Sequence, residues 1–203
     1  MTEPTELPKD PEAAPEASAR PDRNRRRLLQ GGLGAAPFLT LLSRPVLANT
    51  QCFAPSGFIS LPTSQHGPGI ACAGRTPGYW KKEQHFSSWP MPYFPTKVPG
   101  HGGHEATKFV SIFSPSPYAP KTTLLDILSM DGGPPDDVAR HIVATLLNVA
   151  AGLAPVLTVP EVMGIWHEYI LSGGGGSGFF EPTAGVRWYH AEIVDYLVST
   201  MPL

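Results

Sequence analysis

The chain has 203 residues and a net charge of −2, with 41% hydrophobic and 9% aromatic residues. These values are ordinary for a globular protein of one domain or two small ones, and they exclude a wholly disordered chain. The nearly balanced charge gives no indication of a nucleic acid or an anionic membrane as partner. The 21 Gly and 24 Pro predict long irregular connections.

The first 48 residues have the three-part order of a signal peptide. Residues 1–22 are polar, lack apolar periodicity and are expected to be disordered. A basic run at 23–27 precedes an apolar run at 31–42, and the small residue Ala48 ends the segment at the expected cleavage site. The apolar run is too short to cross a bilayer as a helix. We therefore expect an exported protein without a stable transmembrane segment.

The basic run resembles the twin-arginine class of bacterial signal peptides. Residues 24–30 read Asn-Arg-Arg-Arg-Leu-Leu-Gln, where that class has Ser or Thr, two Arg, any residue, Phe, Leu and Lys. Arg25 and Arg26 match the arginine pair. The resemblance implies recognition by the twin-arginine export machinery and a location in the periplasm, at the cell surface or outside the cell. The general secretory route and a basic tail beside a buried helix are the alternatives.

Residues 49–203 are predicted to form one mature domain of mainly α fold. The first half, 49–121, is rich in Pro and Gly and is expected to be irregular, with candidate brief strands at 58–61 and 108–113. The second half, 122–203, is expected to form a compact bundle of about four short helices. Within 49–203 there are eight Lys or Arg against eleven Asp or Glu, a net charge of −3.

Capping residues and apolar periodicity mark the expected helices. The first begins at the pair Thr123 and Asp126, and the third begins behind a capping box of Thr158 and Glu161. The other expected spans are about 136–151, about 159–171 for the third helix, and about 189–199. On the helix at 136–151, the polar face carries Arg140, His141, Thr145 and Asn148.

Cys52 and Cys72 are the two cysteines of the chain. An even number of cysteines in an exported protein predicts a disulfide. Their separation of 20 residues is unlike the Cys-x-x-Cys spacing of a redox pair, although a metal-binding or redox role is the alternative. The disulfide would fix a half of the domain that lacks regular structure.

An aromatic segment follows the second cysteine. Residues 76–81 read Thr-Pro-Gly-Tyr-Trp-Lys, and six aromatic residues lie within 79–94. The segment resembles a domain of secreted and cell-surface bacterial proteins whose signature is Thr-Pro-Gly-Tyr-Trp-Lys followed by Asn-His. Here Lys82 and Glu83 stand in place of Asn-His. The family has no established reaction, so the resemblance implies kinship of fold and location and no catalytic residue.

Two roles are open for the aromatic segment. Its rings either stack on sugars, because Trp and Tyr combine an apolar face with a polar edge, or fill a core that lacks regular structure. The candidate binding residues are Tyr79, Trp80, Lys81 and Trp89. Arg75 and the two lysines that follow Trp80 are expected either to stack on these rings or to be solvated.

A second candidate site is the loop that contains His101, His104 and Glu105. Two imidazoles and a carboxylate are suitable ligands for zinc or copper. The intervening glycines indicate a loop, and a third ligand would have to come from elsewhere, with His85 and His190 as candidates. A mobile polar loop without metal is the alternative.

These features favour a non-enzymatic envelope or secreted module that binds a cell-surface protein or a glycan through its aromatic segment. No nucleophile, base and pocket are recognisable at a catalytic spacing. The alternative is a metal-binding protein or metal-dependent enzyme centred on the loop of His101, His104 and Glu105.

Overall fold

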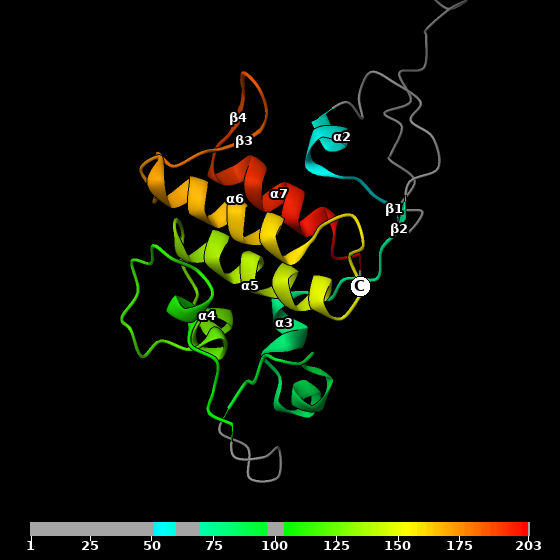
Figure 1. Ribbon diagram of the computed structural model, residues 1–203, viewed down its shortest axis with the longest axis vertical. Coiled ribbons are helices and arrows are strands. Elements are labelled where there is room, and N and C mark those ends of the chain that lie inside the picture. Colours follow the sequence, from blue (N-terminus) through cyan, green and yellow to red (C-terminus); the bar gives the residue numbers. More distant parts are fainter. Residues whose placement is uncertain (1–50, 60–69, 97–103, 203) are drawn as a thin grey trace, which may run out of the picture. The chain divides into compact units, whose positions relative to one another are not determined.

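A computed structural model describes residues 51–59, 70–96 and 104–202 of the chain. All of them belong to one unit, Val46–Leu203. The predicted signal peptide, with Arg25 and Arg26, lies outside the described residues. The described part is mostly helical with a few short strands (Figure 1), which confirms the prediction of a mainly α protein.

Helix α5 (Asp136–Ala150) is the central element of the fold. It contacts four other helices, α3 (Pro77–Trp80), α4 (Leu124–Ser129), α6 (Val159–Leu171) and α7 (His190–Ser199). In Figure 1, α6 and α7 lie on one side of α5, and α3 and α4 lie on the other. Every residue at 138–148 is buried except Arg140, because α5 has neighbours on several sides.

The predicted capping residues begin two of the helices. Thr123 Oγ1 accepts a hydrogen bond from the Asp126 N–H at 3.1 Å, and Asp126 Oδ2 accepts one from the Thr123 N–H at 2.8 Å. Thr158 and Glu161 form the same reciprocal pair at the start of α6. Each pair satisfies two backbone donors that a helix start would leave free.

The described strands form two small antiparallel pairs. Strand β1 (Gln51–Cys52) pairs with β2 (Ile70–Ala71), and β3 (Phe180–Thr183) pairs with β4 (Val186–Trp188). The β3–β4 hairpin lies between α6 and α7 in the chain, in a stretch where the sequence pattern indicated no strand.

The candidate strands at 58–61 and 108–113 are not strands where the structure describes them. Residues 58 and 59 end helix α2 (Pro55–Ile59), and 60 and 61 lie outside the described residues. Residues 109–111 form the 3₁₀ helix η2 (Phe109–Ser111). The helical turn stacks Phe109 on Phe113 with ring centroids 4.8 Å apart. In an extended strand these residues would stand about 13 Å apart.

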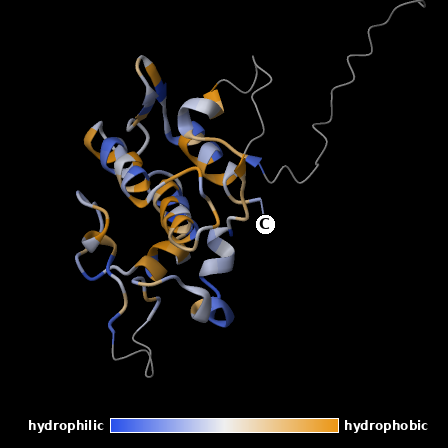
Figure 2. Cartoon of the chain, turned by 45° about the vertical axis from the view of Figure 1, so that its right-hand side comes forward, coloured by the Kyte–Doolittle hydropathy of each residue, from blue (hydrophilic) through white to orange (hydrophobic). Residues whose placement is uncertain are grey.

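Hydrophobic side chains from the helices and from the irregular first half share one core. Trp166 is fully buried, and its ring packs edge-on against Phe109 and alongside Tyr118. Its indole N–H donates to the Pro115 carbonyl at 3.0 Å. Figure 2 shows hydrophobic stretches gathered in the middle of the helical part. No helix in the described part of the chain is long and apolar enough to cross a membrane.

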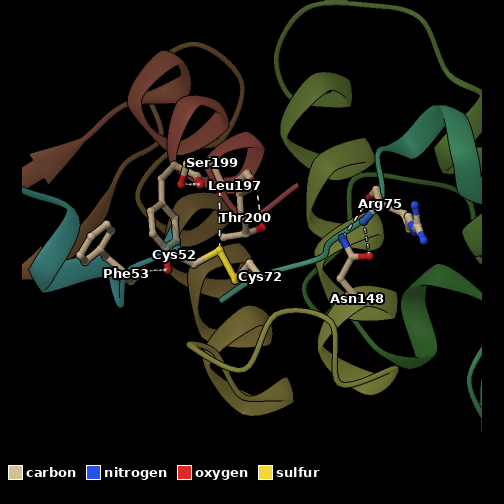
Figure 3. Close-up of a disulfide and its surroundings, with 9 residues drawn as sticks. Cys52, Phe53, Cys72, Arg75, Asn148, Leu197, Ser199 and Thr200 are labelled. Atoms are coloured by element: carbon tan, nitrogen blue, oxygen red, sulfur yellow. Dashed lines mark hydrogen bonds between the residues drawn. A yellow bond between two sulfur atoms is a disulfide. The ribbon is translucent and has the colours of Figure 1, made fainter. Parts of the chain in front are cut away.

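A disulfide joins Cys52 and Cys72, as predicted. Both cysteines are buried, and Ala154 packs beside them. Figure 3 shows the bond next to the C-terminal end of α7, where Cys52 Sγ lies 3.8 Å from the Ser199 carbonyl oxygen. The disulfide therefore fixes the irregular first segment beside the last helix.

We expect the double variant Cys52→Ala, Cys72→Ala to lose roughly 3 kcal/mol of unfolding free energy, because opening a loop of this size frees the unfolded chain. Urea unfolding of the exported protein measures the loss. Reduction of the unsubstituted protein should lower stability by a similar amount. Equal stability of the oxidised and reduced proteins would show that the bond does not constrain the fold.

Candidate functional site

The aromatic segment starts as a short helix that the signature residues build themselves. Thr76 is the N-cap of α3, and its Oγ1 accepts a hydrogen bond from the Tyr79 N–H at 3.3 Å. Pro77 occupies the first turn, where its missing N–H costs nothing. The 3₁₀ helix η1 (Glu83–Ser88) follows. The residues of the signature therefore form a one-turn helix through their own local contacts.

The side chain of Asn148 on α5 holds this segment in place. Its Oδ1 accepts hydrogen bonds from the Arg75 N–H at 2.8 Å and from the Trp80 indole N–H at 3.1 Å. Its Nδ2 donates to the Arg75 carbonyl at 2.9 Å. Asn148 is fully buried, and Figure 3 shows its amide facing the backbone of Arg75. One amide therefore satisfies three groups that would otherwise be left unpaired away from water.

The two tryptophans of the segment belong to the core. Trp80 is 1% exposed and Trp89 is 7% exposed. The indole N–H of Trp89 donates to the Trp80 carbonyl at 3.1 Å, which extends the hydrogen bonds that begin at Asn148. The faces of these two rings are covered by protein, so of the predicted binding residues only Tyr79 and Lys81 lie at the surface.

The surface of the segment combines stacked rings with positive charge. The His85 ring stacks on the Tyr79 ring with centroids 3.8 Å apart and planes within 14°. The Arg75 guanidinium carbon lies 5.1 Å from the centroid of the Tyr79 ring, a cation–π contact. Lys81 and Lys82 are exposed beside them. We call Arg75, Tyr79, Lys81, Lys82 and His85 the basic aromatic surface.

Gly74 precedes the basic aromatic surface and lies where two backbone segments approach each other closely. A Cβ on Gly74 would stand 2.1 Å from the carbonyl oxygen of Thr200, far inside van der Waals contact. Only glycine lets the chain pass this point, between the disulfide at Cys72 and the Asn148 contact at Arg75.

Three of the four residues predicted for the polar face of α5 are buried, whereas the pattern indicated a solvent-facing side. His141, Thr145 and Asn148 are at most 9% exposed. Contacts with α3 and α7 cover these positions. No local pattern distinguishes a polar residue that faces water from one that bonds a distant backbone, which is why the sequence did not identify Asn148 as the residue that fixes the segment.

A second group of polar side chains surrounds Asp137 at the start of α5. Its carboxylate pairs with the Arg140 guanidinium and lies 3.7 Å from Nε2 of His190 on α7. His141 Nδ1 lies 2.7 Å from the Asp137 carbonyl oxygen and 3.4 Å from its carboxylate. Burial lowers the pKa of His141, and the contacts with Asp137 only partly oppose that effect. The neutral form of His141 is therefore favoured in the folded protein.

The candidate metal ligands are only partly described. His101 lies outside the described residues. The His104 ring stacks on Phe94 with centroids 4.5 Å apart, and Glu105 is exposed. The suggested third ligands have other contacts, His85 with Tyr79 and His190 with Asp137. Among the described residues, no three His, Cys, Asp or Glu side chains gather as metal ligands would.

A cavity of about 340 Å³ lies between α2, α6 and β3. Its lining includes two carboxylates of α6, Glu161 and Glu168. Glu161 caps the start of α6, and Glu168 Oε1 accepts a hydrogen bond from the Glu181 N–H at 2.8 Å. Both carboxylates thus have a structural role, and no sequence motif marks either as a site residue.

No protein-family model, curated protein or solved structure matches this chain. The kinship suggested by the signature at 76–81 therefore remains a prediction.

Replacing Asn148 by Ala should lower the unfolding free energy by about 3 kcal/mol, because it leaves buried groups of Arg75 and Trp80 without partners. Trp80→Phe removes one donor of the same network and keeps most of the ring volume. The double variant should lose less than the sum of the two single losses, as interacting residues do. Urea unfolding of all four proteins measures the coupling, and strictly additive losses would contradict this role.

Acidification should destabilise the protein through His141. The pKa of this histidine is lower in the folded chain than its ordinary value of about 6.5, so the unfolded chain binds the proton more readily. The stability present above pH 6.5 is therefore lost as the pH falls through that value towards the lowered pKa. His141→Gln should flatten this part of the stability profile. The same change at the exposed His167 is the matched control.

Proposed function

We propose that residues 49–203 are an exported, non-enzymatic module that binds a component of the cell envelope through the basic aromatic surface. The observation that carries the proposal is the stack of Arg75, Tyr79 and His85 at the surface, on a segment fixed from behind by Asn148. In the finer arrangement that we propose, the helices of the second half form one bundle and the irregular first half wraps around it.

Export is supported by two independent features. The order of basic, apolar and small residues in 1–48 resembles a twin-arginine signal peptide, with Arg25 and Arg26 as the recognised pair. The disulfide between Cys52 and Cys72 is of a kind that persists in oxidising compartments and is rare in the cytosol. Both features point to a protein that works outside the cytoplasm.

Binding through this surface is supported by its rigidity. A flexible segment would lose conformational entropy when it bound, which weakens association. Here the backbone at Arg75 is held by two hydrogen bonds to Asn148, and the Tyr79 ring is held against His85. Arg75, Tyr79 and His85 are therefore already held in place before a partner binds.

The test follows the full-length chain in its native host. The unsubstituted protein should appear as the shorter mature form, bound to the envelope. The variant Arg25→Lys, Arg26→Lys should remain in the cytoplasm as the precursor. The variant Arg75→Ala, Lys81→Ala should be exported and processed but released from the envelope, because it lacks two charges of the binding surface. Cell fractionation followed by immunoblotting measures each form.

A matched control is Lys108→Ala, Lys121→Ala, which removes two exposed charges elsewhere and should stay bound. Release of this control to the same extent would show that net charge alone retains the protein. Retention of the Arg75→Ala, Lys81→Ala protein would refute binding through this surface. A stoichiometric zinc or copper ion in the exported protein, lost in His104→Ala, would favour the metal-binding alternative.

A further inference from the structure

Positive charge is concentrated on the basic aromatic surface although the mature part of the chain is acidic. Arg75, Lys81 and Lys82 are three of the eight Lys and Arg residues in 49–203, and they fall within eight residues of one another. Glu83 is the one acidic residue of 75–89. The rest of 49–203 has five Lys or Arg against ten Asp or Glu, a net charge of −5 that repels anions, so this concentration of cations is a local feature that selects for an anionic ligand.

Among the described residues, these three charges form no ion pair. Within the part of the chain that the structure describes, the ion pairs of Asp and Glu involve Arg140, His141 and His190, and none reaches Arg75, Lys81 or Lys82. A guanidinium beside an aromatic ring keeps the N–H groups of its edge, which suit the two oxygens of a carboxylate. The Arg75 side chain therefore has the capacity to bind an acidic group and is held in place by Tyr79.

The surroundings of these charges are polar and hydroxyl-rich. The exposed residues of the stretch 81–88 are all polar, and they are Lys81, Lys82, Glu83, Gln84, Ser87 and Ser88. A protein–protein interface is usually centred on exposed aromatic anchors and is depleted in lysine. Here Trp80 and Trp89, the two tryptophans of the segment, are buried. Hydroxyl and amide groups beside cations instead match a sugar chain that carries carboxylates.

We infer that the basic aromatic surface binds an acidic polysaccharide, with the carboxylates of uronate units on Arg75, Lys81 and Lys82 and the sugar hydroxyls on Gln84, Ser87 and Ser88. This inference rests on the proposed function and names the chemical class of its ligand. It differs from the predicted stacking of sugars on the tryptophans. In this inference the charged side chains bind the ligand, and the aromatic rings at the surface orient the charged groups.

The test measures binding of the purified exported protein to oligogalacturonate by isothermal titration calorimetry. Neutral galactan oligomers of the same length should not bind. The variant Arg75→Ala, Lys81→Ala should bind oligogalacturonate roughly tenfold more weakly or worse, since charge-assisted hydrogen bonds are lost. The control Lys108→Ala, Lys121→Ala should bind as the unsubstituted protein does. Raising salt from roughly 50 mM to roughly 200 mM should weaken binding on the order of tenfold for three ionic contacts.

Several outcomes would overturn the inference. Equal affinity for the neutral oligomer, or an unchanged affinity of Arg75→Ala, Lys81→Ala, would show that binding does not depend on these charges. Equally tight binding of polyglutamate at the same surface would make an acidic protein the partner. If oligogalacturonate does not bind but the Arg75→Ala, Lys81→Ala variant is released from the envelope, the inference of a polysaccharide ligand is wrong and the proposed function stands. If the variant stays on the envelope, the proposed function itself fails.

Discussion

The buried amide of Asn148 is the contact on which the aromatic segment depends. It bonds both backbone groups of Arg75 and the indole of Trp80, and through Trp80 it is linked to Trp89. An apolar residue at this position of α5 would leave these groups unpaired inside the protein, which costs more than the packing it would gain. The central helix and the signature segment are therefore coupled by the hydrogen bonds of this side chain.

Two further constraints act just before this contact. The disulfide fixes Cys72 beside the end of α7, and Gly74 passes the carbonyl of Thr200 at a distance that no side chain permits. The chain therefore reaches Arg75 on a defined path. The disulfide at Cys72, the close approach at Gly74 and the Asn148 contact at Arg75 thus constrain the backbone one after another. Such rigidity suits a surface that binds with little loss of conformational freedom.

Local chemistry in the sequence determined where the main helices begin and which cysteines pair. The Thr123–Asp126 and Thr158–Glu161 pairs predict helix starts because each satisfies backbone donors within four residues, without help from the rest of the fold. The mainly α character and the disulfide follow from composition, periodicity and cysteine number. The helices depend on neighbours in the chain and the disulfide on there being a single pair of cysteines, so the sequence alone suffices for them.

Burial was decided only by the tertiary structure. Nothing in the local pattern shows that Trp80 and Trp89 lie inside while Tyr79 lies at the surface, or that the polar face of α5 meets a distant backbone. The stretch at 109–111 forms a helical turn because Phe109 and Phe113 stack beneath Trp166, a residue from another part of the chain. Each of these outcomes depends on which segments pack together, and that information is carried by the whole fold and by no single stretch of it.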